Sequence, residues 1–177
     1  MKRFKQIIPL LFLASLSLMM GFKKHLTGKK TEPKWSGTVK FHQKRTGPTI
    51  VRNEWWMIAT ITNNFGNGLD SSFFQSTEGD RAHCATNAKA ELSLGLDEQS
   101  GDYDISVSIP GCYGLKTDRY GKTDSFGLCD ETAILIERQK TSPNPNVLTG
   151  TIRVVEGPDA SGYTVITTHE WDLKKIK

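Results

Sequence analysis

The stretch "GYTVITTHEWDLKKI", residues 162–176, decides the fold class. In an extended chain, one face would carry Tyr163, Val165, Thr167, His169, Trp171 and Leu173. The other face would carry Thr164, Thr168, Glu170 and Asp172, with Ile166 as the interruption. Alternation with a period of two, in residues of high β propensity, is typical of a half-buried strand. The stretch therefore predicts a β-strand near the end of the chain.

Other segments carry the same pattern or a short β-branched run, and none of comparable length has a helical period. These further candidate strands are residues 35–43, 50–62, 90–96, 102–109, 132–138 and 147–156. Several short strands separated by turn residues are typical of sandwiches and barrels. We therefore predict an all-β fold, a single antiparallel β-sandwich or barrel-like domain of about 7–9 strands.

One phrase occurs twice, as "WSGTVKF" at 35–41 and "LTGTIRV" at 148–154. Each copy is followed by a turn-rich segment and then by Glu-Trp, which predicts two similar β-hairpins, first and last in the domain. Internal duplication and plain strand propensity explain the repeat equally well. Gly37 and Gly150 hold equivalent places, where a missing side chain permits a bulge or lets a Trp ring lie close over the backbone.

Two stretches between the hairpins, residues 62–87 and 110–131, are rich in Gly, Asn, Asp and Ser and lack a sustained period. We predict irregular loops there, although a stretch as long as the first also fits a concealed short element. Phe65, Phe73 and Phe74 would pin the first loop onto the body of the domain.

The amino terminus has the form of a secretory signal peptide. Lys2, Arg3 and Lys5 precede an apolar run from Ile7 to Met20, which is shorter than the about 20 apolar residues of a membrane-spanning helix. We predict a signal peptide at 1–21, a flexible basic linker at 22–34 and the all-β domain at 35–177, with an uncleaved anchor as the alternative. The mature protein would then be exported, to the periplasm, the cell surface or the medium, with no membrane span.

The formal net charge of +4 arises mainly from basic residues in the predicted signal and linker. The part that begins at Trp35 carries a small net negative charge, so the charge gives no support for a nucleic-acid partner.

The chain has three cysteines, Cys84, Cys112 and Cys129. Cysteines of an exported protein are expected to form pairs. We predict a Cys112–Cys129 disulfide, because it would clip a Gly-rich segment of little apolar content. The remaining Cys84, next to His83, would then be a buried small side chain or, in the alternative, a nucleophile served by a distant base such as His42 or His169.

We predict neither a metal ion nor another cofactor. The cysteines lack zinc-site spacing. The acidic residues of "DEQSGDYD", residues 97–104, fit a hairpin turn better than a calcium loop, since Ser100 and Gly101 supply turn chemistry.

Histidine 169 lies on the apolar face of the last predicted strand, so we expect a core histidine with satisfied ring nitrogens. Glu170 should point the other way. Familiar hydrolase motifs are missing from the sequence, so we expect a non-catalytic protein. The alternative is a small exported hydrolase or transferase that uses Cys84 or His169.

The pair Trp55-Trp56 is the strongest candidate for function, because adjacent rings on a strand face opposite sides of the sheet. Trp55 aligns with core residues, which leaves Trp56 to stack on a sugar ring or to anchor a protein partner. In the competing reading, the long loop with Phe73 and Phe74 folds over Trp56 and buries it. We name Trp56, Phe73 and Phe74 as candidate ligand-binding residues, for an unknown protein or carbohydrate ligand.

Overall fold

A computed structural model describes residues 32–49, 52–86, 88–128 and 132–176, and the fold below is that of the compact unit Pro33–Lys177. The described residues form eleven strands and no helix. The strands are β1 (Lys34–Thr46), β2 (Asn53–Thr62), β3 (Phe65–Ser76), β4 (Arg81–Ala85), β5 (Glu91–Leu96), β6 (Asp102–Ile109), β7 (Cys112–Thr117), β8 (Thr123–Leu128), β9 (Thr132–Lys140), β10 (Val147–Glu156) and β11 (Thr164–Ile176).

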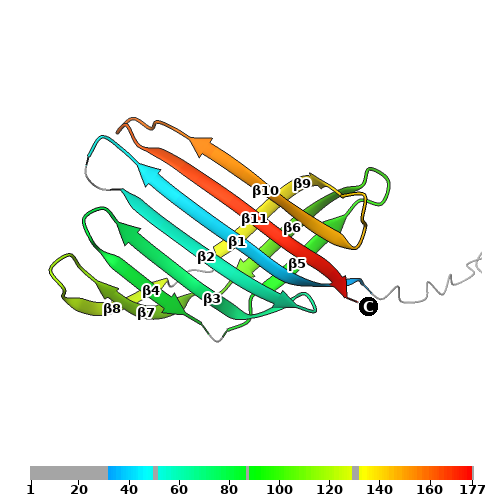
Figure 1. The fold of residues 1–177 in the computed structure, drawn as a ribbon, viewed down its shortest axis with the longest axis horizontal. Coiled ribbons are helices and arrows are strands. Elements are labelled where there is room, and N and C mark those ends of the chain that lie inside the picture. The colour runs from blue at the N-terminus through cyan, green and yellow to red at the C-terminus, as the bar shows by residue number, and fades with distance from the viewer. Residues whose placement is uncertain (1–31, 50–51, 87, 129–131, 177) are drawn as a thin grey trace, which may run out of the picture. The chain divides into compact units, whose positions relative to one another are not determined.

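Eight strands form one large antiparallel sheet in the order β10-β11-β1-β2-β3-β4-β7-β8 (Figure 1). The two predicted hairpins, β1–β2 and β10–β11, are confirmed, and they lie side by side. β1 pairs with β11 without interruption from Lys34↔Ile176 to Thr46↔Thr164. The first strand and the last strand of the domain thus pair with each other, which holds both ends of the fold in one sheet.

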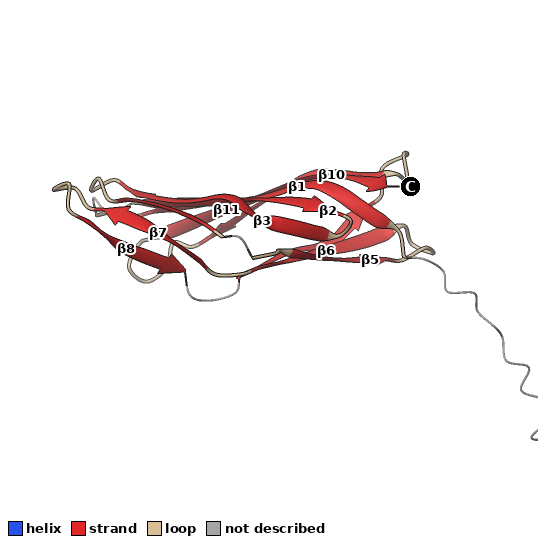
Figure 2. Ribbon diagram, turned by 90° about the horizontal axis from the view of Figure 1, so that it is seen from below, coloured by secondary structure: helices blue, strands red, loops and turns tan. Residues whose placement is uncertain are grey.

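Strands β5, β6 and β9 form a second layer against one face of the large sheet (Figure 2). Among the strands that the structure describes, the second layer pairs with the large sheet where β5 meets β3, at Phe65↔Glu91. We call the covered face of the large sheet its inner face and the opposite one its outer face. The predicted all-β, antiparallel, sandwich-like class is confirmed, but eleven strands exceed the predicted seven to nine.

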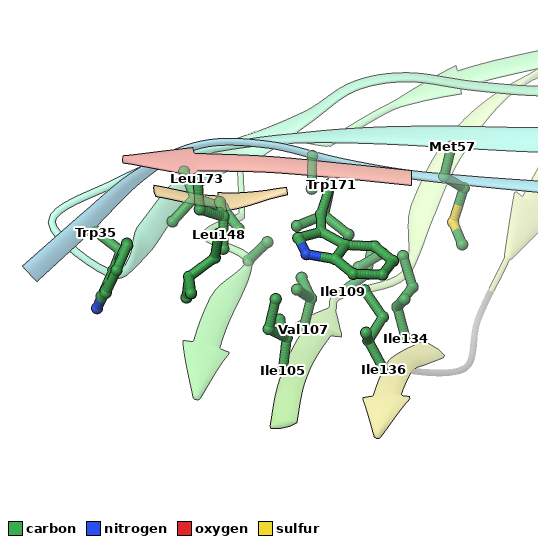
Figure 3. Packing of buried hydrophobic residues seen from close by; sticks show 14 of the residues in the cluster. Trp35, Met57, Ile105, Val107, Ile109, Ile134, Ile136, Leu148, Trp171 and Leu173 are labelled. Atoms are coloured by element: carbon green, nitrogen blue, oxygen red, sulfur yellow. The ribbon is translucent and has the colours of Figure 1, made fainter. Parts of the chain in front are cut away.

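The core lies between the two layers (Figure 3). Trp171 and Leu173 of β11 point from the large sheet toward Ile105 and Val107 of β6, and all four are at most 3% exposed. A hydrogen bond crosses this core: Trp171 Nε1–H donates to the hydroxyl of Tyr103 at 3.0 Å. Both side chains are buried, so the hydrogen bond links the layers in a setting from which water is excluded.

Both predicted glycine sites are places of close approach. A Cβ at Gly150 would lie 2.4 Å from Cζ2 of Trp171, so the ring covers the backbone there as predicted. At Gly37 the φ is +148° and a Cβ would lie 1.9 Å from the carbonyl oxygen of Asp172, so backbone rather than a ring occupies the space.

The predicted irregular loops are wrong. Residues 62–87 contain β3 and β4, and residues 110–131 contain β7 and β8. Alternation fails in β3 because Phe73 and Phe74 are adjacent and both are half-buried, one on each face. On β7 the expected pattern is inverted, since Tyr113 and Leu115 are 75% and 62% exposed. A search for one apolar, buried face therefore overlooks these strands.

The predicted Cys112–Cys129 disulfide is also wrong, because Cys112 is bonded to Cys84, with the two Cα atoms 5.7 Å apart. The segment after Cys112 is a hairpin in which Cys112 lies opposite Leu128. The residue directly across the hairpin from Cys112 is thus Leu128, the residue before Cys129. Strands β4 and β7 instead place Cys84 opposite Gly114, two positions along from Cys112, on the same face. Cys129 itself lies outside the described residues.

The predicted signal peptide and most of the predicted linker lie outside the described residues. Lys34, the last residue of that linker, is already the first residue of β1, and Trp35 is buried. Among the residues that the structure describes, no helix has the length and apolar character needed to cross a membrane.

Candidate functional site

The two adjacent tryptophans of β2 are separated by the sheet, as the alternation predicts. Trp55 packs against the core on the inner face, in line with the fully buried Met57 and Ala59. Trp56 stands on the outer face and is half-buried. Strands β3 and β4 follow β2 within the same sheet, so they do not fold over Trp56 as a loop.

Trp56 is part of a straight row of outer-face residues that crosses all eight strands. We call this set the outer row, and its members, matched pair by pair in the strand registers, are Arg153, Thr168, His42, Trp56, Phe73, His83, Leu115 and Ser125. Neighbouring strands are about 4.8 Å apart, so the row advances by that distance at each strand. The row contains no carboxylate.

The four central rings of the outer row are in contact. Trp56 stacks on Phe73, with ring centroids 5.4 Å apart and planes at 24°. Phe73 in turn meets His83 at 4.7 Å and 33°, whereas His42 meets Trp56 edge to face at 6.1 Å and 80°. Both faces of Phe73 are therefore flanked by other rings. On its other side, toward β1, Trp56 meets only the His42 ring, edge to face, and borders a groove.

A shallow depression of about 350 Å³ lies on this side of Trp56. We call it the His42 groove, and it is lined by His42, Trp56, Ile58, Lys40, Glu54, Glu170, Thr168 and the adjoining Phe41 and Met57. Its rim holds both signs of charge. Glu54 Oε1 lies 2.7 Å from Lys44 Nζ, and Glu54 Oε2 lies 3.9 Å from His42 Nε2. Carboxylate acceptors and ammonium donors thus surround an aromatic wall.

A second depression, of about 360 Å³, lies on the far side of the Trp56–Phe73 stack. We call it the Arg81 groove; it is lined by Phe73, His83, Arg81, Gln75, Leu115, Thr117, Trp56, Phe74 and Ala82. No carboxylate is among its lining residues. Trp56 borders both grooves, so the stack is a ridge between two depressions of different charge.

Phe74 does not extend the stack, although it borders the Arg81 groove. It follows Phe73 on β3 and therefore belongs to the inner-face row, in register with Trp55 and Ala82. Of the three predicted binding residues, the structure brings Trp56 and Phe73 together and leaves Phe74 on the other side of the sheet.

Comparisons of the chain with family models, with curated proteins and with solved structures find no match. The candidate site therefore rests on its own geometry.

Cys84 is 1% exposed and bonded to Cys112, so it has no thiol with which to act as a nucleophile in this form of the protein. The alternative that gave Cys84 a catalytic role is contradicted by this bond.

His169 lies on the inner face beside Phe41, with ring centroids 5.5 Å apart. Its Nδ1 is buried, and no described residue hydrogen-bonds to it, which differs from the satisfied histidine that we predicted. Burial lowers the pKa of His169 and so favours the neutral ring. Glu170 is exposed on the outer face, so the two residues do not form an acid–base pair.

The acidic segment 97–104 forms the predicted turn between β5 and β6 with residues 97–101, and its last three residues begin β6. Asp97 accepts hydrogen bonds from the backbone of Gln99 at 2.9 Å and the hydroxyl of Ser100 at 2.8 Å. These bonds, with that of Gln99 the largest cause, lower the pKa of Asp97. Across the described part of the chain, no group of three or more His, Cys, Asp or Glu is placed to hold a metal ion.

The residues that sequence reasoning missed are the neighbours of Trp56. The sequence predicts a loop for the segment that holds Arg81 and His83, and it offers His42 only as a distant base for Cys84. The register of β1 to β4 places all three beside the stack. A sequence signal for this placement exists only once β3 and β4 are known to be strands.

Proposed function

We propose that this protein is an exported, non-catalytic binding domain whose outer face holds a sugar ring against Trp56. The observation that carries the proposal is the half-buried Trp56, which together with His42 lines a groove with polar side chains along its rim. A pyranose ring has apolar C–H faces and hydroxyl groups around its edge. It matches an aromatic wall bordered by hydrogen-bonding groups.

The charges of the His42 groove favour a neutral polyhydroxylated group. Glu54 and Glu170 accept hydrogen bonds, whereas Lys40 donates them, and sugar hydroxyls can serve both. A purely anionic group would meet two carboxylates there, and a purely apolar one would strip water from charged side chains without replacing it.

Export is supported by two independent features. The sequence begins with the form of a signal peptide. The Cys84–Cys112 disulfide is the kind of bond that persists outside the reducing cytosol. A sugar-binding domain in that setting would act at the cell envelope or beyond it.

The test is calorimetric titration of the oxidised mature protein with chitohexaose, cellohexaose, maltohexaose and hyaluronan hexasaccharide. We expect at least one probe to bind, and Trp56→Ala to weaken that binding about tenfold or more, since each factor of ten is about 1.4 kcal/mol.

The matched control is Trp55→Phe, one residue away on the opposite face, which should lower the melting temperature but leave the affinity intact. Binding by none of the probes, or equal affinity of wild type and a folded Trp56→Ala variant, would overturn the proposal.

A further inference from the structure

The Arg81 groove differs from the His42 groove in charge, and this difference narrows the class of ligand. Arg81 is exposed and forms no ion pair with any residue in the described ranges. His83 lies beside it in β4 and stacks on Phe73. The acidic residues that precede Arg81 in the sequence are engaged elsewhere: Asp80 Oδ2 lies 3.1 Å from Lys116 Nζ, and Glu78 Oε2 lies 3.7 Å from Arg119 Nη1. Glu54, two strands away on the same face, is paired with Lys44.

An unpaired guanidinium beside an aromatic ridge is suited to a carboxylate, which it can bind with two parallel hydrogen bonds. Gln75 lies across from Arg81 in the register and adds an amide to the same groove. The lining has donors and no carboxylate, so an anionic group would meet no repulsion there.

We propose that the Arg81 groove is a subsite for an acidic sugar, and that the ligand is a glycan in which an acidic sugar is joined to a neutral one. This inference rests on the proposed function and extends it. The neutral sugar occupies the His42 groove against Trp56, and the uronic acid carboxylate pairs with Arg81 across the Trp56–Phe73 ridge.

The arrangement of the outer row also gives the direction of the glycan. Both grooves lie along the row, so the chain would run across the strands rather than along them. A polymer in which every sugar is acidic fits less well, because Glu54 and Glu170 border the His42 groove. The same argument disfavours single-stranded nucleic acid, whose backbone carries a charge at every step.

The experiment compares hyaluronan hexasaccharide, in which acidic and neutral sugars alternate, with its carboxyl-reduced and therefore neutral counterpart. Hexagalacturonate and a thymidine hexanucleotide serve as fully anionic probes. Titrations use the oxidised mature protein, its R81Q variant and the control R153Q, which removes an equal charge at the far end of the outer row.

We expect wild type to bind hyaluronan hexasaccharide about tenfold more tightly than the reduced counterpart, with a preference that weakens as salt is added. R81Q should bind the two forms within about twofold of each other, because the loss of affinity falls mainly on the acidic form, whereas R153Q should keep the preference. The exposed position of Arg81 makes a folded variant the expected result, which melting curves check.

Equal, Trp56-dependent affinity of wild type for the acidic and reduced forms would overturn the acidic subsite while leaving the sugar-binding proposal in place. Binding of no oligosaccharide would overturn both. Tighter, Arg81-dependent binding of either fully anionic probe would also overturn the proposed alternation, in favour of a polyanion or, for the thymidine probe, a nucleic acid.

Discussion

Tyr103→Phe removes the hydroxyl that accepts the Nε1–H of Trp171 and so tests how the two layers are joined. Tyr103 and Trp171 are 2% and 3% exposed, so the indole N–H would be left buried without a partner. Such a loss costs about 1–3 kcal/mol. In a domain of this length, 1 kcal/mol corresponds to about 3 °C, so we expect the melting temperature to fall by about 3–9 °C.

Urea denaturation and differential scanning calorimetry of wild type, Tyr103→Phe, Trp171→Phe and the double variant measure the effect. Trp171→Phe also opens a cavity, so it is the more destabilising single change. When Trp171 is already Phe, Tyr103→Phe should lower the free energy of unfolding by about 1 kcal/mol less than it does in wild type, because the indole donor is no longer present. Tyr113→Phe, at a position of β7 that is 75% exposed, is the surface control. An unchanged melting temperature for Tyr103→Phe would refute the idea that this bond holds the layers together.

Tyr103 should also make the stability of the protein depend on pH in the alkaline range. Burial raises the pKa of Tyr103, with the hydrogen bond from Trp171 acting in the opposite direction. The unfolded chain therefore releases this proton first, and the contribution of Tyr103 to stability falls as the pH rises above about 10. Tyr103→Phe should lose this part of the alkaline decline. An identical decline in both proteins would contradict the assignment.

Two further substitutions test the Cys84–Cys112 disulfide and the buried His169. Cys112→Ala removes a disulfide between positions 28 residues apart, so we expect the free energy of unfolding to fall by about 3.5 kcal/mol in urea; a non-reducing peptide map that joins Cys112 to Cys129 would contradict the pairing. His169→Phe should abolish a loss of stability that wild type shows as the pH falls below about 6.5, because burial lowers the folded pKa of this ring. Parallel pH profiles for wild type and variant would refute this.

The strands that sequence reasoning identified have one buried face. In β11, Trp171 and Leu173 are buried while Glu170 and Asp172 are exposed, and this contrast produces the alternation. The same holds for β6, where Tyr103, Ile105 and Val107 are buried. The fold class followed from such strands.

The overlooked strands have no such contrast. In β7 the inner positions after Cys112 are Gly114 and Lys116, and a Cβ at Gly114 would lie 2.0 Å from the carbonyl oxygen of His83. Close packing of backbones thus replaces side-chain burial there. The predicted disulfide is wrong for the same reason. A segment that is predicted to be a loop has no strand register, and without a register the sequence does not show which two of the three cysteines pair.

The candidate site was predictable only in part. Trp56 could be placed on the outer face from β2 alone, because the burial of Met57 and Ala59 fixes the parity of that strand. Phe73, His83 and Arg81 come from two other strands, and their place beside Trp56 depends on pairing between strands. Such pairing is a long-range property that no local pattern contains.

The position of the outer row on strands affects which parts of the sequence can vary without disturbing the candidate site. Its residues stand on strands, and backbone hydrogen bonds across the sheet set their spacing, so the connecting turns contribute none of the stacked rings. The turn from Asp118 to Lys122, for example, presents an 81% exposed Tyr120 beyond the end of β7. Lengthening such a turn costs little, because the entropy of loop closure grows slowly with length. The turns are thus free to gain or lose segments, and even to acquire a second partner, while the rings keep their places.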